Sequence, residues 1–95
     1  MPGYLVSLIN VTDPEKYKEY GRLAGPVLAR FGGKVLARGG ERPVMEGSLN
    51  HARVVIVEFP SVEAAKNFYN SPEYGAARAA REGAADFNMM ITEGI

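Results

Sequence analysis

The sequence predicts an α+β domain in which strands and helical segments follow the order βαββαβ. Three observations support this. Residues 14–31 carry apolar side chains on one side at helical spacing. Residues 54–59 form an apolar run that leads directly into a helix start. Apolar segments of strand length also lie near both ends of the 95-residue chain. A chain of this length holds one hydrophobic core, so residues 1–95 are expected to form a single domain.

Residues 4–11 are predicted to form the first strand. Ser7 is the one polar residue on a strand face that is otherwise apolar. Asp13 and Pro14 then begin a helix, because an aspartate accepts a hydrogen bond from a free backbone N–H and proline suits the first helical turn. The first helix therefore follows the first strand almost directly.

The first helix is predicted to be amphipathic, with Tyr17 and Tyr20 on its inward face. Pro26 should bend it, because proline cannot donate to the carbonyl one turn earlier. The glycine pair at 32–33 should end it. The helix thus places two phenol side chains towards the core.

Two further strands are predicted after this helix. Residues 34–38 form the second strand, and the turn-rich segment 39–43 follows it. Residues 44–46 are expected to continue as a short strand before a loop. Residues 53–59 form the third strand, whose apolar run indicates burial on both faces.

Ser61 is predicted to cap the second helical segment. The segment is interrupted at residues 70–72, where Ser71-Pro72 provides a new cap and a first helical residue. The restarted helix is expected to reach about Gly83, and residues 87–93 form the last strand. Two βαβ halves with an antiparallel four-stranded sheet give a ferredoxin-like sandwich.

The two helical segments are sufficient to cover one face of the predicted sheet. Apolar side chains on both faces of the third and fourth strands would leave an exposed patch in a monomer. A second copy of the chain is the economical cover for this patch. We therefore expect a homodimer in which two sheets pack face to face as a dimeric α/β barrel.

Composition excludes several classes of function. Eleven basic and eleven acidic residues cancel, so no nucleic-acid partner is expected. No apolar run approaches the roughly 20 residues that a membrane span needs, and residues 1–11 make a poor signal peptide, which predicts a cytoplasmic protein without a membrane partner. The chain has no cysteine, and His51 is its single histidine, expected in a surface loop. We therefore expect no metal, no haem and no other cofactor.

Several short motifs resemble those of the uncharacterised domain-of-unknown-function family 1330, nearly from end to end of the chain. The matching segments are Gly32-Gly33-Lys34, Arg38-Gly39-Gly40, Glu46-Gly47, Glu58-Phe59-Pro60-Ser61, Ala64-Ala65, Ser71-Pro72-Glu73-Tyr74, Arg81 and Glu93-Gly94. The resemblance implies the dimeric α/β-barrel superfamily, whose members include cofactor-free oxygenases, lactone isomerases and haem-degrading enzymes. It implies no activity, because the family has no established reaction.

Glu58 is the best candidate for a catalytic residue. A carboxylate in an apolar strand is unfavourable unless it is paired, hydrogen-bonded or protonated, and a raised pKa would suit a general acid or base. The structural alternative is an ion pair with Arg38 or Lys34 across the hairpin. Arg38 itself is either a clamp for a substrate anion or a partner for Glu46 or Glu58.

Four further residues are candidates for ligand binding or packing. Tyr17 and Tyr20 either direct hydroxyls into a cavity or pack in the core with satisfied hydroxyls. Tyr74 follows the helix restart, where a pocket rim is common. Arg81 lies seven residues later on the same helical face as Tyr74, so the two are able to share a site.

Three hypotheses of different classes follow. The first is a cofactor-free enzyme, oxygenase-like or isomerase-like, that acts on a small organic molecule by acid–base chemistry. In it Arg38 orients the substrate, Glu58 moves a proton, and the three tyrosines line the pocket. The second is a non-catalytic small-molecule binding module. The third is a structural dimer without a ligand.

Overall fold

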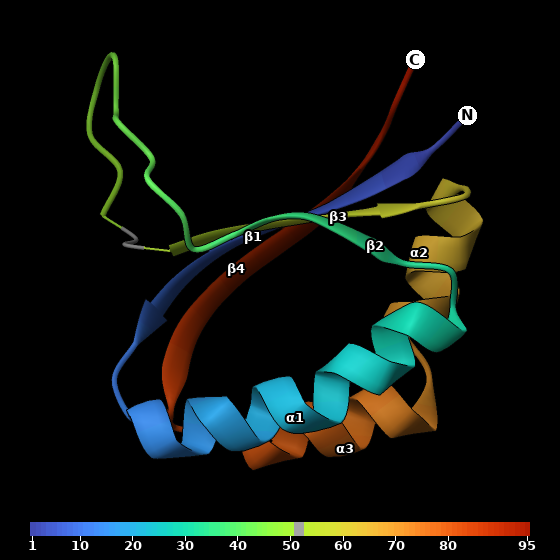
Figure 1. The fold of residues 1–95 in the computed structure, drawn as a ribbon, viewed down its shortest axis with the longest axis horizontal. Helices are drawn as coiled ribbons and strands as arrows, with labels where there is room; N and C mark the ends of the chain where they lie inside the picture. The colour runs from blue at the N-terminus through green and yellow to red at the C-terminus, as the bar shows by residue number, and fades with distance from the viewer. Residues whose placement is uncertain (51–52) are drawn as a thin grey trace.

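The computed structural model describes residues 1–50 and 53–95, and it has the predicted order of elements with the second helical segment divided in two (Figure 1). Its strands form one antiparallel sheet in the order β2-β3-β1-β4, which confirms the predicted ferredoxin-like α+β fold. The elements are β1 (Gly3–Val11), α1 (Pro14–Arg30), β2 (Lys34–Arg38), β3 (Arg53–Phe59), α2 (Val62–Tyr69), α3 (Pro72–Ala80) and β4 (Ala85–Glu93).

The helices lie on one side of the sheet, here called the inner face, and the opposite side is called the outer face (Figure 1). Successive residues of a strand point to opposite faces. In β1, Leu5 and Ile9 are buried on the inner face, whereas Val6 and Leu8 are half-buried on the outer face. The strand therefore has a helix-covered side and an uncovered apolar side.

The first helix is held at both ends by the predicted signals. The side chain of Asp13 accepts a hydrogen bond from the backbone N–H of Lys16 at 3.3 Å. Pro26 lies inside the helix, and the helix axis changes direction in its C-terminal half (Figure 1). Gly32 follows the last turn with φ of +82°, a conformation that suits glycine.

Ser71 controls the break between α2 and α3. Its hydroxyl accepts from the backbone N–H of Tyr74 at 3.1 Å and donates to the carbonyl of Phe68 at 2.8 Å. Ser61 caps α2 in the same way, accepting from the N–H of Ala64 at 3.0 Å. The break at Ser71 turns the chain so that Tyr74, in the first turn of α3, enters the core with no exposed surface.

Residues 44–46 do not form the predicted short strand. The chain from 40 to 50 instead forms a loop without strand or helix that stands above the outer face (Figure 1). A continuation of β2 would lack a partner, because Arg38 already pairs with Val55 close to the start of β3. Pro43 also has no N–H to donate to a ladder. His51, predicted to lie in this loop, falls outside the described residues.

The last helix and strand also differ from the prediction in their bounds. The helix α3 ends at Ala80 rather than near Gly83, and β4 begins at Ala85. The carbonyl of Ala84 accepts from the backbone N–H groups of Thr12 and Asp13 at 2.8 and 2.9 Å. This contact joins the start of β4 to the end of β1 and fixes where α3 must stop.

Two glycines give a matched test of this packing. A Cβ on Gly75, within α3, would meet nothing within 4 Å, whereas a Cβ on Gly3 would lie 2.6 Å from the carbonyl oxygen of Ser61. Gly75→Ala should raise the free energy of unfolding by about 0.5–1 kcal/mol, because alanine favours the helix. Gly3→Ala should lower it by about 1–3 kcal/mol through overpacking. Urea unfolding measures both, and equal effects would contradict the close contact of β1 with α2.

Candidate functional site

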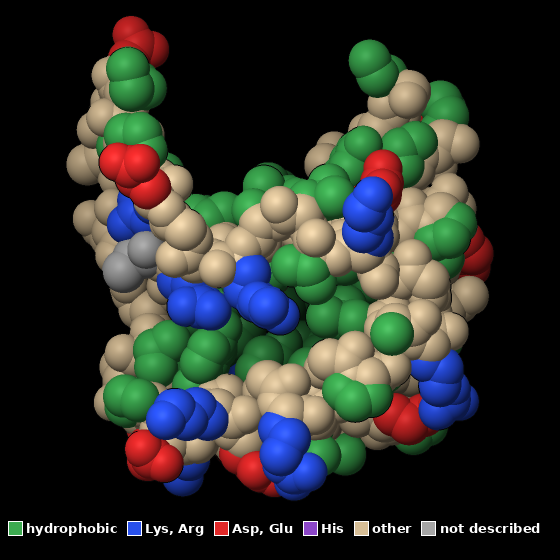
Figure 2. All heavy atoms as spheres, in the orientation of Figure 1, with side chains coloured by type: hydrophobic (Ala, Val, Ile, Leu, Met, Phe, Trp, Pro, Cys, Tyr) green, Lys and Arg blue, Asp and Glu red, His purple; other side chains and the backbone are tan. Residues whose placement is uncertain are grey.

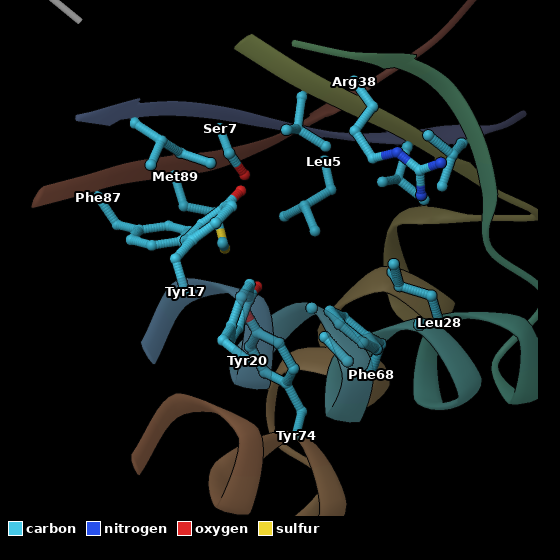
Figure 3. Close-up of a pocket in the computed structure, with 17 residues that line it drawn as sticks. Leu5, Ser7, Tyr17, Tyr20, Leu28, Arg38, Phe68, Tyr74, Phe87 and Met89 are labelled. Carbon is cyan, nitrogen blue, oxygen red and sulfur yellow. The ribbon is translucent and has the colours of Figure 1, made fainter. Parts of the chain in front are cut away.

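A cavity of about 100 Å³ lies between the inner face of the sheet and the helices (Figure 3). Most of its lining is apolar, and the strands β1, β2, β3 and β4 together with α1, α2 and α3 all contribute to it. The lining residues are Leu5, Ser7, Ile9, Tyr17, Tyr20, Gly21, Ala24, Gly25, Leu28, Val35, Arg38, Val55, Val57, Phe68, Tyr74, Phe87 and Met89.

Aromatic side chains form the helical side of the cavity. The ring of Tyr20 contacts Tyr17 and Phe87, with centroids 5.8 and 5.5 Å away. The hydroxyls of Tyr20 and Tyr74 are hydrogen-bonded at 2.8 Å. Phe68 stacks on Tyr74 with centroids 4.3 Å apart. These rings contact one another and form a continuous aromatic wall, to which the helices and Phe87 of β4 contribute.

Burial perturbs the hydroxyl of Tyr20. Desolvation raises its pKa well above the ordinary value of a tyrosine, and the neighbouring hydroxyl of Tyr74 adds to the increase. The phenol therefore stays protonated across the physiological range. It acts here as a hydrogen-bonding group rather than as a base.

Three polar side chains reach the cavity without a partner. Arg38 extends from β2 into it, and the hydroxyls of Ser7 and Tyr17 point towards one another across its other end (Figure 3). Within residues 1–50 and 53–95, none of the three side chains forms a hydrogen bond or ion pair. Unpaired polar groups over an apolar surface are typical of a ligand pocket.

The structure brings four of the predicted site residues together. Tyr17, Tyr20, Arg38 and Tyr74 all line the cavity. The hydroxyls of Tyr20 and Tyr74 satisfy each other's hydrogen bonding, as expected of tyrosines packed in the core. The hydroxyl of Tyr17 has no hydrogen-bond partner among the described residues and is directed into the cavity (Figure 3). The predicted alternatives for Arg38, an ion pair with Glu46 or Glu58, do not occur in this part of the chain.

Glu58 lies on the other side of the sheet. It alternates with the buried inner-face residues Val57 and Phe59, so its side chain belongs to the outer face. There its carboxylate accepts a hydrogen bond from the hydroxyl of Tyr4 at 3.3 Å. Lys34 is its neighbour in the ladder, yet no ion pair forms between them. Glu58 therefore does not share a site with the cavity residues of its own chain.

Arg81 lies behind the wall of the cavity. Its guanidinium carbon is 3.7 Å from the centroid of Phe87 and 5.3 Å from that of Tyr20. Among the described residues its Nε is buried without a hydrogen-bond partner. Arg81 therefore contacts two rings of the cavity wall, Phe87 and Tyr20, and it does not join Tyr74 in the cavity lining.

The predicted site residues leave out several side chains at or beside the cavity. Ser7, Phe87 and Met89 line the cavity, and Arg53 lies over the ring of Tyr17 at 5.4 Å. The signal for Ser7 was present, because it interrupts an apolar strand face. The signal for Arg53 was its alternation with Val55, which places both side chains on one face.

The described residues contain no group of three or more histidine, cysteine, aspartate or glutamate side chains placed to hold a metal ion. The cavity lining consists of apolar, hydroxyl, glycine and arginine residues. The chemistry available at the cavity is therefore hydrogen bonding by hydroxyls and attraction of an anion by arginine.

No helix in residues 1–50 and 53–95 is long and apolar enough to span a membrane.

The raised pKa of Tyr20 predicts a loss of stability in alkali. The unfolded phenol ionises near pH ~10, whereas the folded phenol keeps its proton. The difference in pKa therefore leaves the free energy of unfolding unchanged below pH ~10. Above that pH the free energy of unfolding falls, because the unfolded state binds fewer protons than the folded state. Tyr20→Phe should flatten the fall in unfolding free energy between about pH 9 and 11. Urea titrations test this, with Tyr69→Phe as control; equal slopes would contradict it.

Comparison with known proteins places the chain among proteins of the same fold. A protein of unknown function from Rhodopseudomonas palustris is 29% identical, with 99% of this chain and 82% of that one covered and a TM-score of 0.80. The cofactor-independent oxygenase SnoaB from Streptomyces nogalater is 12% identical, with 99% and 93% covered and a TM-score of 0.67. A dimeric ferredoxin-like protein of unknown function from Bacteroides fragilis is 14% identical, with 98% and 96% covered and a TM-score of 0.64.

No curated protein matches the chain. The identities of the oxygenase and the dimeric protein are low enough that they show the fold alone. A family model, by contrast, matches residues 2–95, which is almost the whole chain. The protein therefore belongs to the family described as domain of unknown function (DUF1330).

Proposed function

We propose that the protein is a homodimer in which each protomer binds a small organic molecule in the inner-face cavity. The observation that carries the binding proposal is the set of three unpartnered polar groups around an apolar cavity. Arg38, Ser7 and Tyr17 are the groups that would orient the ligand, and Leu5, Ile9 and their neighbours would contact its apolar part. These groups reach the cavity without a hydrogen-bond partner among the described residues, so they are available to a ligand.

The outer face supports the homodimer. Val6, Leu8, Val54 and Ile56 are only half-buried on this face, and the side chain of Met90 is 59% exposed. The loop 40–50 and the two chain ends rise on either side of it and leave a trough between them (Figures 1 and 2). A second sheet packed into this trough would cover the apolar floor and contact the exposed apolar side chains of the loop.

A cofactor-free enzyme is the second candidate, and the hydroxyls of Ser7 and Tyr17 beside Arg38 favour it. Hydrogen-bond donors and a cation held in an apolar cavity are suited to stabilise a substrate enolate or another oxyanion. The shared fold with SnoaB is compatible with such chemistry. In this hypothesis Glu58 does not transfer the proton, because its side chain lies on the outer face. The proton would instead be exchanged with the substrate itself, with solvent or with the hydroxyl of Tyr17.

Blocking the cavity tests the binding proposal. Gly21 lines the cavity and Gly75 does not, and a Cβ on either would meet nothing within 4 Å. Gly21→Leu should abolish the rise in melting temperature that small organic ligands produce, whereas the matched Gly75→Leu should keep it. Thermal denaturation with a panel of small carboxylates, amides and alcohols measures the effect. A rise that persists in Gly21→Leu would contradict binding in this cavity.

Charging the outer face tests the homodimer. Met90→Lys places a cation on the proposed interface at a position that is solvent-exposed in the protomer. The dissociation constant of the variant dimer should be at least tenfold higher than that of the wild-type dimer, because a buried unpaired charge opposes association. Val11→Lys, at the exposed end of β1, is the control. Sedimentation equilibrium gives both constants, and a monomeric wild type would refute the proposal.

A further inference from the structure

Arg53 is a second arginine on the inner face beside the cavity. It pairs across the sheet with Ile9, a buried inner-face residue, and it alternates with Val55 and Val57 of the cavity lining. Its guanidinium lies over the ring of Tyr17, 5.4 Å from the centroid. Among the described residues its Nε is buried with no hydrogen-bond partner. A donor on the cavity side of the sheet is therefore unused.

Gly39 leaves the space in which the guanidinium of Arg53 lies. A Cβ at this position would be 2.5 Å from Nη1 of Arg53, and the φ of +68° also suits glycine. The N–H of Gly39 donates to the carbonyl of Val54 at 3.0 Å, which holds this turn against β3. The backbone thus packs against the arginine and restricts where it can move.

Arg38 and Arg53 are close neighbours on this face. Arg38 pairs with Val55, two residues from Arg53, so the two side chains occupy diagonal positions of adjacent strands. Such positions are roughly 7–8 Å apart. Figure 2 shows Lys and Arg side chains gathered directly above a hollow with hydrophobic walls. Arg38 lines the cavity, and Arg53 lies over Tyr17, another lining residue, so both arginines lie next to the cavity.

Neither arginine is neutralised by a carboxylate within residues 1–50 and 53–95. Two adjacent cations repel each other, and the partial burial of Arg53 removes some of the water that would screen this repulsion. A bound anion relieves this repulsion, and the planar guanidinium matches the two oxygens of a carboxylate. The arrangement is therefore more favourable with a carboxylate present.

The cavity limits the apolar part of such a ligand. Its volume is about 100 Å³, whereas a cavity of roughly 150 Å³ accommodates benzene. The space is therefore sized for a small group such as a branched alkyl chain. Leu5, Val57 and Met89 would contact it.

From these observations we infer that Arg38 and Arg53 form a two-arginine clamp that selects small aliphatic monocarboxylates for the inner-face cavity. The inference rests on the proposed ligand-binding function and names its ligand class. In this arrangement the carboxylate lies between the guanidiniums, and the alkyl group points towards β1. The hydroxyls of Tyr17 and Ser7 are available to a further oxygen of the ligand.

A matched pair of probes tests the clamp: 3-methylbutanoate and its neutral amide, 3-methylbutanamide. Nuclear magnetic resonance titration should show the carboxylate bound at least tenfold more tightly than the amide, with shifts in both arginine Nε–H signals. Arg53→Gln should reduce carboxylate affinity at least tenfold and leave amide affinity unchanged. Arg78→Gln is the control, because Arg78 lies over Tyr69, away from the cavity lining.

Two further variants protect the test from a folding defect. Arg53→Lys keeps the charge and loses the planar fork, so it should lose less affinity than Arg53→Gln. Gly39→Ala should displace the guanidinium and weaken carboxylate binding without removing a charge. Equal binding of acid and amide in the cavity would overturn the clamp while the pocket stands. Absence of any shift in the cavity methyl signals with either probe would overturn the proposed function itself.

Discussion

The burial of Tyr74 is the constraint on which the cavity depends. Ser71 caps α3 and turns the chain so that this side chain enters the core with no exposed surface. A buried phenol hydroxyl needs a partner, and Tyr20 on α1 provides it at 2.8 Å. That hydrogen bond ties α3 to α1. Both tyrosines line the cavity, so the bond lies within its wall.

The same bond organises the neighbouring rings. Tyr20 contacts Tyr17 and Phe87, and Arg81 stacks on Phe87 from behind. The aromatic wall is thus supported on both sides and leaves Tyr17 with its hydroxyl directed into the cavity (Figure 3). The helix break at Ser71 therefore has a direct consequence for the composition of the cavity wall.

Local signals in the sequence were sufficient for most of the fold. Capping by Asp13, Ser61 and Ser71 placed every helix start, and the apolar run gave the bounds of β3 as observed. The predicted short strand at residues 44–46 was wrong, because strand formation there depends on a partner strand that local sequence does not reveal. The bounds of α3 were wrong because the contact of Ala84 with the end of β1 is long-range.

The site was predicted in part, and the reason is geometric. Tyr17 and Tyr20 follow from helical spacing, Tyr74 from the helix restart at Ser71, and Arg38 from its place at a strand end. Glu58 was singled out by its chemistry, yet strand alternation with Val57 and Phe59 assigns it to the outer face. Arg53 was available from the same alternation. The helices decide which face has the cavity, because they cover only one side of the sheet (Figure 1).

In the two-arginine clamp, the counter-charge of Arg38 and Arg53 comes from a ligand anion at the inner-face cavity. A crystal structure of the protein grown with 3-methylbutanoate would show both the assembly and the partners of the two arginines. The clamp predicts density for the carboxylate between the two guanidiniums and for the alkyl group within the cavity. An empty cavity, with both arginines paired to carboxylates of the protein or of a second copy, would contradict it.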